Sequence, residues 1–267
     1  MRFSVTGFLI VGYICIATTD LNAQSPYALN VEKEAVILGA GLSVAIVDLE
    51  LIKKTAPLTI DELSTLSREN VNSFDRAATY NWSPSSSDLS DILLLTSVLS
   101  PFLLFSSSAV WDDGGNYTIM YLENVIWSFS LPHLAKGTVT RYRPFVYNSE
   151  APEEQKLNPD ATLSFFSGHT TYAFSSAVFL STTFANYNPD SSLKPYVWGS
   201  SLLLAATIGY LRFAAGMHYP TDILTGAVVG SAIGFLIPLI HEKEVDSSSE
   251  VLVKIPTNNV FAISIGF

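Results

Sequence analysis

Charged residues and cysteines are scarce in this sequence. Asp, Glu, Lys and Arg make up 14% of its 267 residues, against about 25% in an ordinary soluble domain. The single cysteine, Cys15, excludes an intrachain disulfide and a metal site built from several thiolates. Basic residues are fewer than acidic ones, because 14 Lys and Arg stand against 24 Asp and Glu, for a net charge of -10. A nucleic-acid partner is therefore not expected, since phosphate backbones are bound by basic surfaces.

Long apolar segments are plentiful instead. Hydrophobic residues account for 48% of the chain and the mean hydropathy is positive, which favours association with a membrane. Residues 1–23 contain Arg2, an apolar run over 8–17, and Ala23 just before Gln24. This pattern predicts a signal peptide or an N-terminal anchor.

The apolar segments after the leader predict an all-α fold, a bundle of about six helices with the active site at one end. A polar stretch over 59–80 predicts one or two surface helices, and serine and proline in 83–87 predict a loop. Helices of about 20 apolar residues are long enough to cross a bilayer, although the number of true crossings stays open. The six expected helices cover residues 35–49, 92–110, 119–136, 169–187, 196–213 and 222–241.

The C-terminal residues have a different pattern. Alternating β-branched and polar residues in 251–255 and 260–267 flank Pro256 and predict a short β-hairpin-like tail. The expected organisation is therefore a leader or anchor over 1–23, a helical domain over 24–243 and a tail over 244–267.

Three segments of the helical domain concentrate residues suited to phosphate chemistry. Planar guanidinium groups bind phosphate oxygens bidentately and a lysine adds a point charge, so Arg143, Arg212 and Lys136 suit a tetrahedral anion. Ser167 and Gly168 precede an apolar helix, whose free backbone N–H groups favour an anion. The loop over 137–163, which carries Arg143, is also longer than a connector needs to be, as functional loops often are.

His218 and Asp222 are four residues apart at the expected start of the last helix. Asp222 can then accept a hydrogen bond from one ring nitrogen of His218 and leave the other nitrogen as a nucleophile. His169 follows Gly168 directly and is the second histidine of this group.

These residues, in this order and spacing, resemble the motifs K-x6-R-P, P-S-G-H and S-R-x5-H-x3-D of the type 2 phosphatidic acid phosphatase and vanadium-dependent haloperoxidase superfamily. The chain differs at two positions, with Phe166 in place of the proline and Leu211 in place of the serine. The resemblance covers residues 136–222 and points to the membrane-associated phosphatase branch found in bacteria. It implies that His218 attacks phosphorus, Asp222 orients His218, and His169 protonates the leaving oxygen and then activates water.

The expected activity is metal-independent hydrolysis of a phosphomonoester through a phosphohistidine, and the apolar bundle favours a lipid phosphate or pyrophosphate. No cofactor is expected. Two alternatives remain: a soluble periplasmic non-specific acid phosphatase, and a haloperoxidase. In the haloperoxidase, vanadate would be held by Lys136, Arg143, Ser167, Gly168, Arg212 and His218. Neither the substrate nor the oligomeric state can be read from the sequence.

The expected location is export, with the site facing the periplasm. Six crossings after a cleaved or retained leader would instead place the motifs in the cytoplasm. An exported site therefore requires the leader to replace the helix over 35–49 as the first crossing, or a bundle that does not span the membrane.

Several other polar residues have structural interpretations. Arg141 is expected at the mouth of the site or on the surface, His133 at a helix end, and Glu123 as a packing group or a partner for a site cation. Glycines at 226, 230 and 234 predict close contact of the last helix with a neighbouring backbone.

Overall fold

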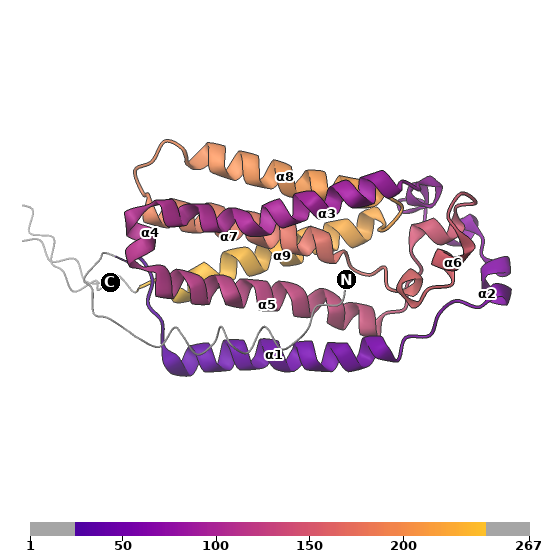
Figure 1. Ribbon diagram of the computed structural model, residues 1–267, viewed down its shortest axis with the longest axis horizontal. Coiled ribbons are helices and arrows are strands. Elements are labelled where there is room, and N and C mark those ends of the chain that lie inside the picture. The colour runs from indigo at the N-terminus through magenta and orange to yellow at the C-terminus, as the bar shows by residue number, and fades with distance from the viewer. Residues whose placement is uncertain (1–24, 244–267) are drawn as a thin grey trace, which may run out of the picture.

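The computed structural model of the protein describes residues 25–243, and these residues form a helical bundle (Figure 1). No strand occurs among the described residues, and the leader of 1–23 and the hairpin-like tail of 244–267 lie outside them. Short helices α2 (Ile60–Thr65), α4 (Ser108–Asp112) and α6 (Glu153–Lys156) lie in the connections. The predicted all-α bundle is confirmed, with its long helices α1 (Val31–Lys53), α3 (Pro84–Leu99), α5 (Gly114–Thr138), α7 (Gly168–Tyr187), α8 (Lys194–Ala214) and α9 (Pro220–His241).

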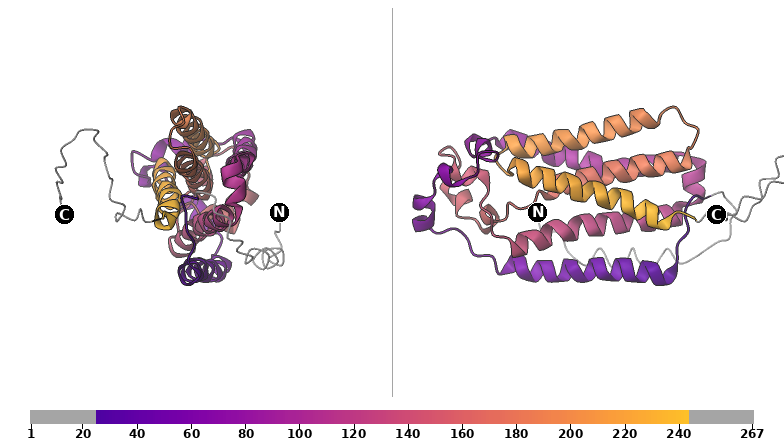
Figure 2. Two further views of the ribbon diagram at one scale, coloured as in Figure 1. Left: turned by 90° about the vertical axis from the view of Figure 1, so that its left-hand side faces the viewer. Right: turned by 180° about the vertical axis from the view of Figure 1, so that it is seen from behind.

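Successive long helices run in opposite directions along the bundle (Figures 1 and 2). The ends of α1, α5 and α8 therefore meet the starts of α3, α7 and α9 at one end, together with α2 and α6. We call this the loop end. Residues 25–28 lie at the opposite end beside residues 241–243, where backbone hydrogen bonds join Ala28 N to His241 O and Lys243 N to Pro26 O, each at 2.9 Å.

Helix α7 lies at the centre of the bundle and packs against α9, α8, α5 and α3. The predicted close approach of the last helix is confirmed at α7. A Cβ atom added to Gly226, Gly230 or Gly234 would lie 2.7, 2.3 or 2.4 Å from a backbone oxygen of α7 or of Ser167 just before it. Only glycine allows this approach, and it holds the first turns of α7 and α9 side by side at the loop end.

The expected helix over 92–110 is wrong at both ends. Helix α3 begins at Pro84, where the sequence predicted a loop, because Ser83 caps the helix by accepting from Ser86 N and proline fits its first turn. Its α-helical part ends at Leu99, and the segment Ser100–Ser106 continues as a 3-10 helix that contains Pro101. The stretch over 59–80 forms only α2 and two short 3-10 helices, Arg68–Asn70 and Arg76–Tyr80.

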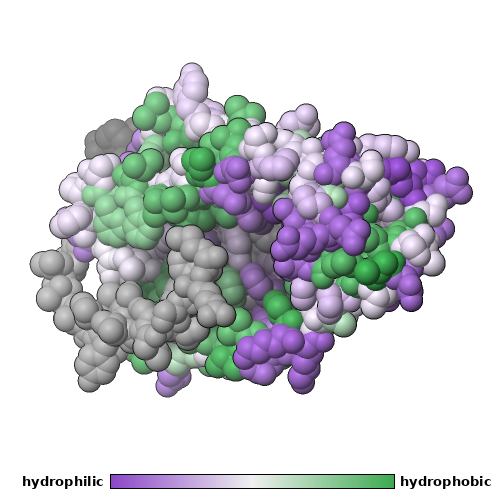
Figure 3. All heavy atoms as spheres, turned by 45° about the vertical axis from the view of Figure 1, so that its right-hand side comes forward, coloured by the Kyte–Doolittle hydropathy of each residue, from purple (hydrophilic) through white to green (hydrophobic). Residues whose placement is uncertain are grey.

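Four helical segments are long and apolar enough to cross a bilayer: Val31–Lys53, Pro84–Ser106, Lys194–Ala214 and Pro220–His241. Their outward faces carry large apolar side chains such as Ile46, Ile92, Leu203 and Val228, each more than 60% exposed. Hydrophobic residues gather over the helices, and hydrophilic residues gather at the loop end (Figure 3). A bundle with this much apolar surface associates with a membrane.

Candidate active site

A cavity of about 400 Å³ opens at the loop end of the bundle. Six of the eight predicted site residues line the cavity: Lys136, Arg143, Gly168, His169, Arg212 and His218. The other two predicted residues, Ser167 and Asp222, are fully buried. The fold thus brings together three segments that are far apart in the sequence.

Arg143 is 4% exposed and is held by Asp160 from the long loop. Its Nε donates to the backbone oxygen of Asp160 at 2.9 Å, and its Nη2 donates to the Asp160 carboxylate at 2.8 Å. The surrounding protein would by itself raise the pKa of Asp160, whose side chain is still 58% exposed, but the charges of Arg143 and Lys136 outweigh this effect and lower the pKa. Asp160 was not predicted, although its place in a long polar loop was the available signal.

Arg212 and His169 are both held by the first turns of α3. Arg212 Nη1 donates to Ser87 Oγ at 3.2 Å and Ser90 Oγ at 3.1 Å, and it lies 3.5 Å from Asp91 Oδ1. His169 Nε2 lies 2.7 Å from the same Asp91 oxygen. The three α3 residues share one helix face because they are three and four positions apart. Sequence reasoning missed them because it assigned the start of α3 to a loop.

His218 is 1% exposed and lies between Asp222 and the cavity. Its Nε2 lies 3.4 Å from Arg143 Nη1, on the side of the ring that faces the cavity. Its Nδ1 lies 3.6 Å from Asp222 Oδ2, which is too long for a hydrogen bond. The expected Asp222–His218 hydrogen bond is therefore absent from this structure, because Asp222 Oδ2 already accepts from Ser164 Oγ at 2.6 Å and Tyr219 N at 3.0 Å.

Burial disfavours the charged imidazolium form of His218, and the positive charges of Arg143 and Lys136 disfavour it further. Together they lower the pKa of His218 well below its usual value. The imidazole is thus neutral near pH 7, as a nucleophilic nitrogen must be.

Arg141 lies behind the cavity, which corrects its interpretation as a mouth or surface residue. Its Nη2 donates to Asp75 Oδ2 at 2.7 Å, and its Nη1 forms an ion pair with Asp222. The guanidinium carbon lies 4.2 Å from the centre of the Tyr219 ring. Asp75 also accepts from Thr221 N at 3.0 Å. Asp75 and Arg141 thus fix the first turn of α9, and nothing in the polar stretch around Asp75 signalled this role.

Replacing Arg141 by alanine leaves Asp75 and Asp222, both fully buried, without their shared countercharge. We expect a loss of about 3 to 5 kcal/mol in the free energy of unfolding, the usual cost of breaking a buried ion pair. Thermal or denaturant unfolding in detergent measures this loss. The double variant Arg141→Ala, Asp75→Asn should recover part of it, and equal stability of wild type and Arg141→Ala would contradict this prediction.

Ser167 caps α7, which explains why its side chain lies behind the cavity. Its Oγ accepts from Thr170 N at 3.3 Å and Thr170 Oγ1 at 2.9 Å. Gly168 begins the helix, and a Cβ added there would lie 3.9 Å from Lys136 Nζ. The start of a 20-residue helix therefore faces the cavity beside a lysine, an arrangement that favours an anion.

His133 also lines the cavity, together with Phe129 and Tyr172. Its Nδ1 lies 2.7 Å from the backbone oxygen of Phe129. Glu123, by contrast, lies nowhere near the site cations, because it contacts His241 at the opposite end of the bundle.

The donors of this cavity suit an anion better than a metal ion. Lys136, Arg143 and Arg212 supply three cationic groups, whereas the nearby carboxylates of Asp91 and Asp160 already pair with His169 and Arg143. A phosphate or a vanadate group fits such a set, since both are tetrahedral oxyanions.

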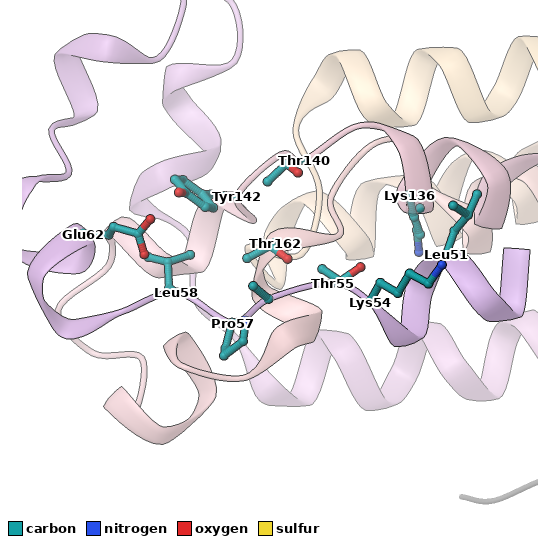
Figure 4. A pocket seen from close by; sticks show the side chains of 12 residues that line it. Leu51, Lys54, Thr55, Pro57, Leu58, Glu62, Lys136, Thr140, Tyr142 and Thr162 are labelled. Atoms are coloured by element: carbon teal, nitrogen blue, oxygen red, sulfur yellow. The ribbon is translucent and has the colours of Figure 1, made fainter.

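A second cavity of about 310 Å³ adjoins the first and shares Lys136 with it (Figure 4). The end of α1 and the segment that follows it form one wall, including Leu51, Lys54 and Leu58. Tyr142 and Thr162 from the long loop form another part.

Known proteins similar to this chain include one family and several individual proteins. The family model described as PAP2 superfamily matches residues 117–246. This segment belongs to the PAP2 superfamily. It contains all eight predicted site residues.

Two curated relatives match parts of the chain. A lipid A 4'-phosphatase from Porphyromonas gingivalis is 38% identical over 77 residues, which are 29% of this chain and 29% of the relative. A probable diacylglycerol pyrophosphate phosphatase 1 from Schizosaccharomyces pombe is 33% identical over 97 residues, 34% of this chain and 35% of the relative. The matches thus span about a third of these relatives.

Among solved structures, the crystal structure of a transmembrane PAP2 type phosphatidylglycerolphosphate phosphatase from Bacillus subtilis is 20% identical, with a TM-score of 0.43. The match covers 75% of this chain and 94% of that one.

Proposed function

We propose that this protein is a membrane phosphatase that hydrolyses a lipid phosphate or pyrophosphate without a metal ion, through a phosphohistidine. One observation carries the proposal. The Nε2 of the neutral His218 ring faces a cavity lined by Lys136, Arg143 and Arg212, which opens at the loop end of an apolar bundle.

In the proposed first step, the lone pair of His218 Nε2 attacks phosphorus and the bond from phosphorus to the leaving oxygen breaks. Arg143, Arg212 and Lys136 stabilise the charge on the phosphoryl oxygens in the transition state. Burial lowers the pKa of His169 to about 4, and the negative charge of a bound phosphate raises it again, so that His169 gives its proton to the leaving oxygen. In the second step His169 takes a proton from water, the water oxygen attacks phosphorus, and the bond to His218 breaks. General acid and base help of this kind contributes about 10²- to 10⁴-fold in rate.

Three observations support a lipid substrate. The bundle carries apolar faces long enough to sit in a bilayer. The second cavity beside Lys136 offers room for the rest of a headgroup. The two curated relatives are named for lipid A and for diacylglycerol pyrophosphate.

The substrate class can be tested with purified protein in detergent. Phosphate release is measured in EDTA from phosphatidic acid, a polyprenyl pyrophosphate and a soluble phosphomonoester. We expect release from a lipid substrate with a kcat/KM well above that for the soluble ester. Equal use of the soluble ester would favour a non-specific acid phosphatase. Bromide oxidation after vanadate loading, without phosphate release, would overturn the proposal.

The proposed nucleophile also predicts a pH dependence. Because the pKa of His218 is lowered, the fall of kcat/KM on the acid side of the pH profile should lie below about pH 6.5, which is the ordinary pKa of histidine. We call this fall the acid limb. Replacing Lys136 by methionine removes one positive charge facing His218, which raises the pKa of His218 and moves the acid limb to higher pH. An acid limb that stays in place or moves to lower pH in Lys136→Met would contradict this assignment.

We further propose that the site faces the periplasm. Residues 25 and 243 lie at the end of the bundle away from the site, so in a bundle that spans with α1 included this orientation requires both residues to face the cytoplasm and a leader that does not cross the membrane.

Membrane-impermeant maleimide labelling of spheroplasts tests this orientation. In a Cys15→Ser background, exposed Glu69→Cys at the loop end should be labelled, and exposed Asp190→Cys between α7 and α8 should not be. The reverse pattern would place the site in the cytoplasm.

A further inference from the structure

A buried cluster of one histidine and two glutamates lies at the end of the bundle opposite the active site. Glu34 comes from the first turn of α1, Glu123 from α5, and His241 from the last turn of α9. They are 7%, 0% and 1% exposed, and one ligand atom from each lies within 4.8 Å of the others. The proposed phosphatase reaction uses none of them.

The hydrogen bonds of His241 define which nitrogen faces the glutamates. Nδ1 lies 2.7 Å from the backbone oxygen of Ile237, which can only accept, so Nδ1 carries a hydrogen. Nε2 of the neutral ring then presents its lone pair to Glu34 Oε2 at 2.7 Å and Glu123 Oε2 at 3.4 Å. Such an arrangement requires either a proton on Nε2, which makes the ring an imidazolium, or a cation between the lone pair and the carboxylate oxygens.

Glu123 strengthens this requirement. Neither of its carboxylate oxygens has a hydrogen-bond partner within residues 25–243, and the side chain is fully buried. An ionised carboxylate in such a place costs several kcal/mol unless a positive charge balances it. The nearby Lys33 does not fill this role, because its Nζ donates to the backbone oxygen of Ile240 at 2.7 Å.

We propose that Glu34, Glu123 and His241 bind one divalent transition metal ion, such as zinc. Imidazole nitrogen and carboxylate oxygen are both ligands that zinc accepts. The ion would balance the two negative charges. Tetrahedral ligands about 2.0 to 2.1 Å from zinc lie roughly 3.4 Å apart, so the Nε2 to Glu123 distance already fits, and the shorter Glu34 contact opens by a side-chain rotation.

The neighbours of the ligands support this assignment. A histidine that binds a metal usually donates its other ring N–H to a carbonyl or carboxylate, as His241 does to Ile237. Glu34 is oriented in the same manner, because its Oε1 accepts from Asn30 N at 2.9 Å and its Oε2 is left for the ion. The backbone groups of the two helix ends thus hold two of the three ligands in place.

Such an ion would hold α1 in the bundle. Among the long helices, α1 packs mainly against α5. The ion would join the first turn of α1 to both α5 and α9. This role is structural and does not depend on the proposed phosphatase activity.

The metal content of purified protein tests the site. After expression with added zinc, wild type and His218→Ala should each contain about one equivalent of zinc by mass spectrometry, and Glu123→Gln and His241→Ala at least tenfold less. Asp48→Asn is the matched control, because it makes the same kind of change at a fully buried carboxylate of α1 outside the cluster. It should keep its zinc.

A titration of metal-free wild type with Zn²⁺ alone gives a second measurement, and its result for wild type does not depend on how well any variant folds. Zn²⁺ should raise the melting temperature of wild type and Asp48→Asn but not of Glu123→Gln, and Mg²⁺ should have no such effect. Wild type without bound zinc and without a zinc-dependent melting temperature would overturn the proposal, as would equal zinc in wild type and Glu123→Gln. Failure of the phosphatase proposal would look different, since His218→Ala would then keep both zinc and activity.

Discussion

Replacing His218 by alanine is expected to lower kcat/KM for the lipid substrate by about four to six orders of magnitude, as loss of a nucleophile does in other hydrolases. The side chain is 1% exposed, and its Nε2 faces the cations of the cavity. His169, the other histidine of the predicted site, has its Nε2 paired with Asp91. The loss should therefore fall on kcat.

Rapid acid-free quenching with a radiolabelled substrate measures the same step directly. Wild type should form an acid-labile phosphoenzyme within one turnover, and His218→Ala should form none. His169→Ala should form the phosphoenzyme more slowly than wild type and should also release it slowly. Activity of His218→Ala above about a hundredth of wild type would contradict the nucleophile assignment, given the size of the loss expected.

Replacing Arg143 by alanine is expected to lower kcat by about 10²- to 10³-fold, the usual effect of removing one donor that stabilises transition-state charge. Asp160 holds the Nε and Nη2 of Arg143, so its Nη1 is directed toward His218. Lysine cannot make these bonds to Asp160 and still reach the phosphate with a second donor. Arg143→Lys should thus recover only part of the lost activity.

Arg76→Ala is the matched control for Arg143. Arg76 also lies at the loop end, but it donates to the backbone oxygen of Val71 and does not line the cavity. Steady-state kinetics should give Arg76→Ala a kcat close to that of wild type. Full activity in Arg143→Lys would show that a point charge is sufficient and would contradict the role given to the Asp160 contacts.

The sequence alone was sufficient to group the residues that the fold brings together at the cavity or directly behind it. His218 and Asp222 are four positions apart at a helix start, and Ser167, Gly168 and His169 are consecutive, so local spacing encodes their grouping. The apolar runs likewise predicted the long helices, because a helix that faces lipid or a helical core must be apolar over many turns. The start of α3 was missed, since a proline and serines there resemble a loop although they also suit a helix start.

Only the tertiary structure decided which groups hold these residues in place. Asp75 reaches Arg141, Asp91 reaches His169, and Asp160 reaches Arg143 from other parts of the chain. Glu34 and His241 meet in the same manner across 207 positions of sequence. A single acidic residue in a polar segment has no local pattern that names its partner. Its role depends on the burial and the distances that arise when the helices pack.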